Sequence, residues 1–224
     1  MSMFADVRSR ISGQLSRATE AGELRRRGDE LLLQLVDRAI ARWTSGPLPG
    51  AGVDENGHNV ILAKCMHEVR SRDSRFQWQR INPELPALTP AMLAGTAPPS
   101  GAKRPDISVA ANVDDAGWSV ECKKLQHTPQ SRQYVTEGMS RFADGQYSPK
   151  RALGAMVGYV YAATAADRVR EVNTVVPVLP GPATPLAPHP PLSTGGRLSR
   201  AASTHPRAPS APDLRLEHFL LKCD

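Results

Sequence analysis

The distribution of proline constrains this chain more than any other feature of its sequence. Ten of the 20 prolines lie between Pro177 and Pro212, a segment that contains no Asp or Glu. Because proline has no backbone N–H and a fixed φ, helices and central strands are excluded over most of this segment. We therefore expect a Pro-rich flexible segment at 177–212, and a packed core smaller than the length of 224 residues suggests.

Outside that segment, the hydrophobic pattern changes repeatedly between helical and strand periodicity, which predicts an α/β fold with a mixed central sheet flanked by helices. We expect an N-terminal helical extension (1–46), a core (54–176) and a terminal strand (213–224) that completes the core sheet. The predicted helices cover residues 23–43, 55–72, 134–147 and 166–173, and the predicted strands cover residues 76–81, both arms of a hairpin within 104–125, then 152–163 and 213–224.

Composition indicates a soluble cytoplasmic protein. Hydrophobic residues make up 40% and charged residues 22% of the chain, and no apolar run approaches the roughly 20 residues that span a bilayer. The three cysteines are odd in number and far apart, which argues against a disulfide framework. The formal net charge of +6 is compatible with a polyanionic partner, although moderate basicity is also common in proteins that never bind nucleic acid.

The hairpin sequence RPDISVAANVDDAGWSVECKKL, residues 104–125, carries the polar residues of greatest chemical interest. Successive strand side chains face opposite sides, so Glu121 and Lys123 share one face. A turn at 113–116 places Asp106 across from Lys123 and diagonal to Glu121, within reach of cross-strand neighbours. Two converging carboxylates are costly without a cation, and Mg²⁺, or Mn²⁺ in its place, suits such oxygen ligands. Lys123 could then orient or deprotonate a water.

The RPD triplet, fourteen residues and then the ECK triplet resemble the motif of the PD-(D/E)xK nuclease superfamily, in its bacterial branch. The resemblance implies a restriction-endonuclease-like fold over residues 54–224 and a Mg²⁺-dependent endonuclease. In this site Asp106 and Glu121 would be metal ligands, with the Cys122 carbonyl as a third and Lys123 positioning the water. It also implies DNA rather than RNA as substrate, a role in anti-phage defence or restriction, and a homodimer or a separate ATPase or helicase as partner.

Further residues extend this candidate site. The resemblance implies one more acid from the preceding helix, for which we favour Glu55, with Glu68 left open. The YVTEGMSRFADGQY block at 134–147 and the Ser203, His205, Arg207 pattern also resemble members of the superfamily. Contacts to the substrate backbone are expected from cations near the site in sequence, namely Lys103, Arg104, Lys124, Arg141, Lys150 and Arg151.

Other interpretations of these residues remain open. Asp106 could begin a turn while Glu121 and Lys123 form an exposed ion pair worth little energy. Arg141 could hold the carbonyls at the end of its own helix instead of phosphate. A non-catalytic or latent nucleic-acid-binding or assembly subunit, docked through the arginine-rich helix before residue 46, is the alternative function, and an RNA-directed effector differs only in substrate. Cys65, His58 and His67 lack a second ligand pair at zinc spacing, so we expect helix packing there.

Overall fold

The computed structural model describes residues 23, 26–48, 50, 52–83, 105–111, 117–179, 181–189, 196–207 and 211–224. A helix over residues 26–44 precedes α2 (Glu55–Arg72). The later helices are α4 (Thr128–Gln133), the π-helix η3 (Tyr134–Met139), α5 (Ser140–Ala143) and α6 (Ala165–Val175), with short 3₁₀ turns η1 (Ser74–Phe76) and η4 (Val176–Val178). None of the helices in the described ranges combines the length and the apolar character needed to cross a bilayer.

The described strands form one seven-stranded mixed sheet in the order β1-β2-β3-β4-β7-β6-β5. Their bounds are Gln79–Pro83 for β1, Ile107–Ala111 for β2, Trp118–Leu125 for β3, Leu153–Val160 for β4, Ala187–His189 for β5, Leu198–His205 for β6 and Leu214–Lys222 for β7. The pairs β3–β4 and β4–β7 are parallel, and all other pairs are antiparallel. The expected α/β class with a mixed sheet is therefore confirmed.

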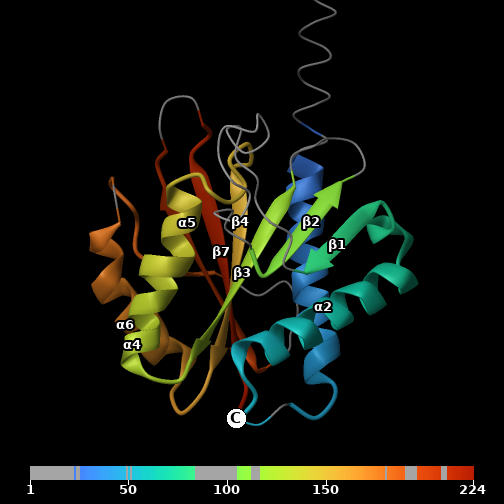
Figure 1. Ribbon diagram of the computed structural model, residues 1–224, viewed down its shortest axis with the longest axis horizontal. Coiled ribbons are helices and arrows are strands. Elements are labelled where there is room, and N and C mark those ends of the chain that lie inside the picture. Colours follow the sequence, from blue (N-terminus) through green and yellow to red (C-terminus); the bar gives the residue numbers. More distant parts are fainter. Residues whose placement is uncertain are drawn as a thin grey trace, which may run out of the picture.

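Helices cover both faces of the sheet (Figure 1), so its central strand has no solvent-facing side. All eight residues of β4 are buried, as expected for a strand between two parallel neighbours under two helical layers. The helix over residues 26–44 and α2 pack on one face, and α4, η3, α5 and α6 pack on the other. The site described below lies along β3, which is reached by Glu55 at the start of α2 and by Arg141 of α5.

Local sequence signals explain where the helices begin. The Asp54 side chain accepts from the Gly57 N–H at 2.7 Å and so caps α2, which spans the predicted residues 55–72. Thr164 and Asp167 form a capping box at the start of α6. Gly145, with φ of +70°, follows α5 and ends that helical run in a conformation that favours glycine.

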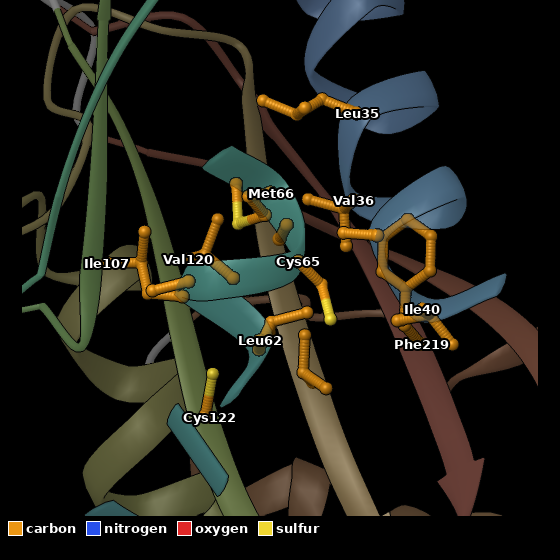
Figure 2. Close-up of a cluster of buried hydrophobic side chains, with 14 of the residues drawn as sticks. Leu35, Val36, Ile40, Leu62, Cys65, Met66, Ile107, Val120, Cys122 and Phe219 are labelled. Atoms are coloured by element: carbon orange, nitrogen blue, oxygen red, sulfur yellow. The ribbon is translucent and has the colours of Figure 1, made fainter. Parts of the chain in front are cut away.

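The helix over residues 26–44 is part of the main core and not a separable extension. Leu35, Val36 and Ile40 from this helix pack with Leu62 and Met66 of α2 in a single apolar cluster (Figure 2). Val120 and Cys122 of β3 contribute to the same cluster, so they face α2 while Glu121 and Lys123 face the other way, as the strand alternation predicts. The part of the predicted extension before residue 23 lies outside the described residues.

One expectation about the carboxyl-terminal part needs correction. The Pro-rich segment contains the full strand β6 (Leu198–His205). Prolines lie on both sides of this stretch but not within it, so its backbone can pair as a strand. Each of its eight residues pairs with β7, so this part is not a tether. The predicted terminal strand is present as β7, which pairs with β4 on one side and with β6 on the other.

Candidate active site

The candidate site forms where β3 continues beyond its pairing with β2. The ladder between these strands pairs only Ile107, Ser108 and Val109 of β2, and ends at Val120 of β3, whereas β3 runs on to Leu125. Two backbone N–H groups on this uncovered edge bind carboxylates: Cys122 donates to Asp106 Oδ2 at 2.7 Å and Lys124 donates to Glu55 Oε2 at 2.9 Å. Both acids are thus fixed by the strand that carries Glu121 and Lys123.

The observed register corrects the predicted one by two residues. Because Ile107 pairs with Val120, Asp106 lies beside Glu121, whereas a turn at 113–116, outside the described residues, was expected to place it across from Lys123. A slip of two residues keeps every side chain on its own face of the sheet, so the hydrophobic pattern does not distinguish the two registers. Asp106 nevertheless lies close to Glu121 and Lys123, because its carboxylate accepts from the N–H of Cys122, the residue between them.

Lys123 lies among carboxylates. Its Nζ is 2.9 Å from Glu55 Oε1 and 3.2 Å from Glu121 Oε1, and its side chain is only 12% exposed. Burial alone would lower the pKa of Lys123, but the Glu121, Glu55 and Asp106 carboxylates outweigh it and raise that pKa well above the usual value. Lys123 therefore carries its proton at neutral pH, which favours orienting a water over deprotonating one.

Glu121 is the most buried acid of the site. Its side chain is 1% exposed, and Oε1 accepts from Arg141 Nη1 at 2.7 Å as well as facing Lys123. Burial first, and then the Asp106 carboxylate, raise the pKa of Glu121 to about 7 against the lowering effect of Lys123 and Arg141. Its other oxygen, Oε2, is buried and has no hydrogen-bond partner among the described residues. A buried carboxylate oxygen in this state is costly for folding alone.

The start of α2 is held firmly, which fixes Glu55. His58 bonds through Nδ1 to the Asp54 carbonyl at 2.6 Å and through Nε2 to the Tyr161 hydroxyl at the end of β4. Glu68, the other candidate acid, forms an ion pair with Arg42 of the preceding helix at 2.9 Å. The structure therefore brings Glu55, and not Glu68, to Lys123.

Arg141 reaches Glu121 from a distorted helix. The run α4-η3-α5 contains the π-helix η3, a form that is rare and frequent at functional sites. A Cβ at Gly138 would lie 2.5 Å from Met156 Cε and 3.7 Å from Glu121 Cγ, so glycine permits the close approach of this helix to β3 and β4. Arg141 Nη1 also donates to the Tyr147 hydroxyl at 3.1 Å, and burial together with Glu121 raises the pKa of Tyr147 to about 12.

Arg207 holds the segment that follows Arg141. Its guanidinium donates to the carbonyls of Phe142, Tyr147, Ser148 and Arg151 at distances between 2.7 and 3.3 Å. This bonding fastens the turn that carries Tyr147 to the end of β6. The sequence pattern with Ser203 and His205 pointed to Arg207, but nothing in it indicated that the partners are backbone carbonyls.

The remaining predicted cations differ in their surroundings. Lys124 Nζ donates to the Val53 carbonyl at 3.1 Å and lies over the Tyr161 ring. Arg151 is 3% exposed and stacks on Trp118 at 3.9 Å, so the expected phosphate contact from this residue is wrong. Lys150 is exposed, and Lys103 and Arg104 lie outside the described residues.

Ser203 and His205 are buried and belong to a polar chain inside the core. Ser203 Oγ lies 2.8 Å from His205 Nε2 and 2.9 Å from His218 Nε2, and His218 Nδ1 lies 2.9 Å from the Tyr134 hydroxyl. Burial lowers the pKa of His205 to about 4 and that of His218 to about 3. At 2%, 1% and 0% exposure, Ser203, His205 and His218 do not meet a substrate. Sequence analysis missed the part that His218 plays.

The donor set fits a hard divalent cation better than a soft one. Within the described ranges no group of three or more His, Cys, Asp or Glu side chains is arranged to hold a metal, so a zinc-type cage is not present there. Asp106 and Glu121 supply two carboxylates, and the buried Glu121 Oε2 accepts no hydrogen bond from the part of the chain that the structure describes. The Cys122 C=O points to the same edge as its N–H, because both groups of one strand residue point the same way. Mg²⁺ takes few protein ligands and keeps its waters, so these residues fit it.

Comparison of this chain with protein-family models, with curated proteins and with solved structures finds no match in any of the three. The feature of this chain that bears on function is the β3 edge, where Glu55 from the start of α2 and Asp106 from just before β2 approach Glu121 and Lys123 of β3.

Proposed function

We propose that this protein is a metal-dependent nuclease of the restriction-endonuclease-like type. The observation that carries the proposal is the meeting of Asp106, Glu121 and Lys123 on the uncovered edge of β3, where Glu121 Oε2 is buried and no described residue bonds to it. Lys123 and Arg141 compensate only two of the three carboxylates from Asp106, Glu121 and Glu55, and a divalent cation would neutralise the remaining negative charge.

The order of elements supports the same proposal. After the helix over residues 26–44 come α2, the antiparallel strands β1, β2 and β3, the helical run α4-η3-α5, and then β4 parallel to β3. The resemblance to the PD-(D/E)xK superfamily requires a helix, a hairpin whose second strand carries the lysine, a helix and a buried strand. Each of these elements is present in that order around Glu121 and Lys123.

In this proposal, Asp106, Glu121 and the Cys122 carbonyl would hold Mg²⁺, with Mn²⁺ as a substitute. A bound divalent cation would supply charge neutralisation at the phosphate and a lowered pKa for a coordinated water. The protonated Lys123 ammonium donates a hydrogen bond that orients the attacking water or a phosphate oxygen. Glu55 accepts from Lys123 and from the β3 backbone, so it positions the lysine.

Nucleic acid is the proposed substrate, with DNA favoured over RNA by the resemblance alone. Besides Lys123, Arg141 is a described cation that contacts one of the carboxylates, and a guanidinium binds phosphate oxygens through two parallel N–H groups. Lys124 is a further proposed phosphate contact, although its Nζ donates to the Val53 carbonyl here. Participation in anti-phage defence or restriction, and a homodimer or an ATPase partner, remain proposals that this geometry does not address.

The test is cleavage by the purified full chain of supercoiled plasmid, linear duplex, single-stranded DNA and RNA, in Mg²⁺, Mn²⁺ or EDTA. We expect metal-dependent scission of at least one substrate. The cleavage rate should fall by about a hundredfold or more in Lys123→Ala and in Asp106→Ala. Lys64→Ala removes an exposed lysine on α2 and should cleave like the wild type. Thermal melting of each variant checks that it is folded.

Cleavage that persists in EDTA, or in both site variants while they remain folded, would contradict the proposal. Metal-independent binding of nucleic acid without any scission would instead support the alternative, a non-catalytic binding or assembly subunit with the same fold.

A further inference from the structure

The charges around Glu121 are already largely compensated by side chains of this chain. Three carboxylates, from Asp106, Glu121 and Glu55, face the two cations Lys123 and Arg141. Both cations lie at the same oxygen, Glu121 Oε1, while Glu121 Oε2 has no hydrogen-bond partner among the described residues. A divalent cation entering here would therefore face a site with two positive charges in place.

Of the two cations, only Arg141 is attached in a way that allows it to leave. Lys123 is 12% exposed and is held from the far side by Glu55 at 2.9 Å. Arg141 is 24% exposed and projects from α5 on a long side chain, and its Nη1 donates both to Glu121 Oε1 and to the Tyr147 hydroxyl, so it has a second partner besides Glu121. Its guanidinium can release Glu121 while it still contacts the Tyr147 hydroxyl.

We propose that Arg141 occupies the Glu121 carboxylate in place of the metal, and that metal binding displaces it to hold a phosphate oxygen of the substrate. This inference rests on the proposed metal site. Arg141 thus has two opposite effects on affinity: it weakens the binding of the metal, and it strengthens the binding of the substrate phosphate once the metal is bound. A planar guanidinium suits both partners, since it forms paired hydrogen bonds with carboxylates and with phosphates alike.

Electrostatics predicts the direction of the effect. Removing the Arg141 charge strengthens the binding of any cation at Glu121. The electrostatic energy gained is twice as large for a divalent ion as for a proton, because this energy is proportional to the charge. Proton uptake by Glu121 therefore offsets only part of the gain for the metal. We expect Arg141→Gln to bind Mn²⁺ at least about tenfold more tightly, or about 1.4 kcal/mol.

The experiment is calorimetric titration of the full chain with Mn²⁺ at pH 8 in the absence of nucleic acid. The variants are Arg141→Gln, which removes the charge, and Arg141→Lys, which keeps it and should bind Mn²⁺ like the wild type. Arg132→Gln is the matched control, because Arg132 is an exposed arginine of the same helical run, and its Mn²⁺ affinity should be unchanged. Melting curves in EDTA verify folding.

A second measurement separates the two roles of Arg141. At saturating Mn²⁺, single-turnover cleavage by Arg141→Gln should be slower by about a hundredfold although its metal affinity is higher. Unchanged or weaker Mn²⁺ binding by Arg141→Gln, with wild-type binding intact, would overturn the inference and leave the metal site standing. If neither the wild type nor Arg141→Gln binds Mn²⁺, the proposed function itself fails.

Discussion

At the scale of single residues, the buried Glu121 carboxylate lowers the stability of the fold and, in the proposed function, binds a cation. Its pKa of about 7 lies above that of an unfolded glutamate, so its contribution to stability is lost as the pH rises through that value. Glu121→Gln should therefore raise the free energy of unfolding at pH 8 in EDTA by about 1 kcal/mol, because an uncharged amide of the same shape replaces a buried charge. Urea denaturation measures this gain.

The same substitution should abolish metal-dependent cleavage, so that stability and activity change in opposite directions. Glu137→Gln, at an exposed position of η3, should alter neither quantity. A clear loss of stability in Glu121→Gln would mean that Glu121 serves the fold, through Arg141 and Lys123, and not a cation.

His205 and His218 make a second, independent residue-scale prediction. Burial holds their pKa values at about 4 and about 3, whereas an unfolded histidine titrates near 6.5. Because the unfolded chain takes up protons first, the free energy of unfolding should fall as the pH drops below about 6.5. The slope should reach about 1.4 kcal/mol per pH unit for each histidine.

Urea denaturation at pH 7, 6 and 5 tests this contribution. His205→Gln should remove about one histidine's share of the slope, whereas His67→Gln, at an exposed position of α2, should leave it unchanged. A slope that His205→Gln does not reduce would show that His205 is protonated in the folded protein, contrary to the observed burial.

At the scale of elements, the turn after α5 depends on Arg207. Arg207→Lys keeps the charge but loses the fork that reaches the carbonyls of Phe142, Tyr147, Ser148 and Arg151. We expect a loss of about 2–3 kcal/mol in the free energy of unfolding, since hydrogen bonds to charged groups are worth more than neutral ones. Amide hydrogen exchange over residues 144–151 should accelerate in the folded state.

Arg197→Lys changes an exposed arginine just before β6 and serves as the control for Arg207→Lys. Equal exchange rates over 144–151 in both variants would mean that this turn holds its shape without Arg207.

Helix boundaries followed from the sequence wherever capping chemistry is local, as for α2 after Asp54 and α6 after Thr164. The π-helix η3 did not, because no local capping signal specifies it; its Gly138 packs closely against Met156 of β4, a contact that the local sequence does not reveal. The predicted register between β2 and β3 was wrong for a different reason: a shift of two residues leaves Ile107 and Val109 on the same face of the sheet.

At the scale of the whole molecule, sequence patterns predicted the α/β class but not the order of the strands. β7 follows a segment rich in proline, and its place between β4 and β6 depends on pairings that join distant parts of the chain. The meeting of Asp106, Glu121 and Lys123 was predictable, because one hairpin carries all three residues. The sequence indicated Arg141 either as a phosphate contact or as a cation over the carbonyls of its own helix end, and its ion pair with Glu121 required the three-dimensional arrangement.

The helix over residues 26–44 decides whether the fold is one unit. If this helix were an extension, truncating a buried residue in it would cost little, but Ile40 is fully buried against α2 and the sheet. Ile40→Ala should therefore lower the free energy of unfolding by about 2–5 kcal/mol in a single cooperative transition. Arg27→Ala, at an exposed position of the same helix, should change it by no more than about 0.5 kcal/mol. Trp118 of β3 donates to Asp29 of this helix at 2.6 Å, so Ile40→Ala should destabilise the helix and the strand that carries Glu121 together. A separate, earlier unfolding transition of the helix would show instead that it folds independently of the sheet.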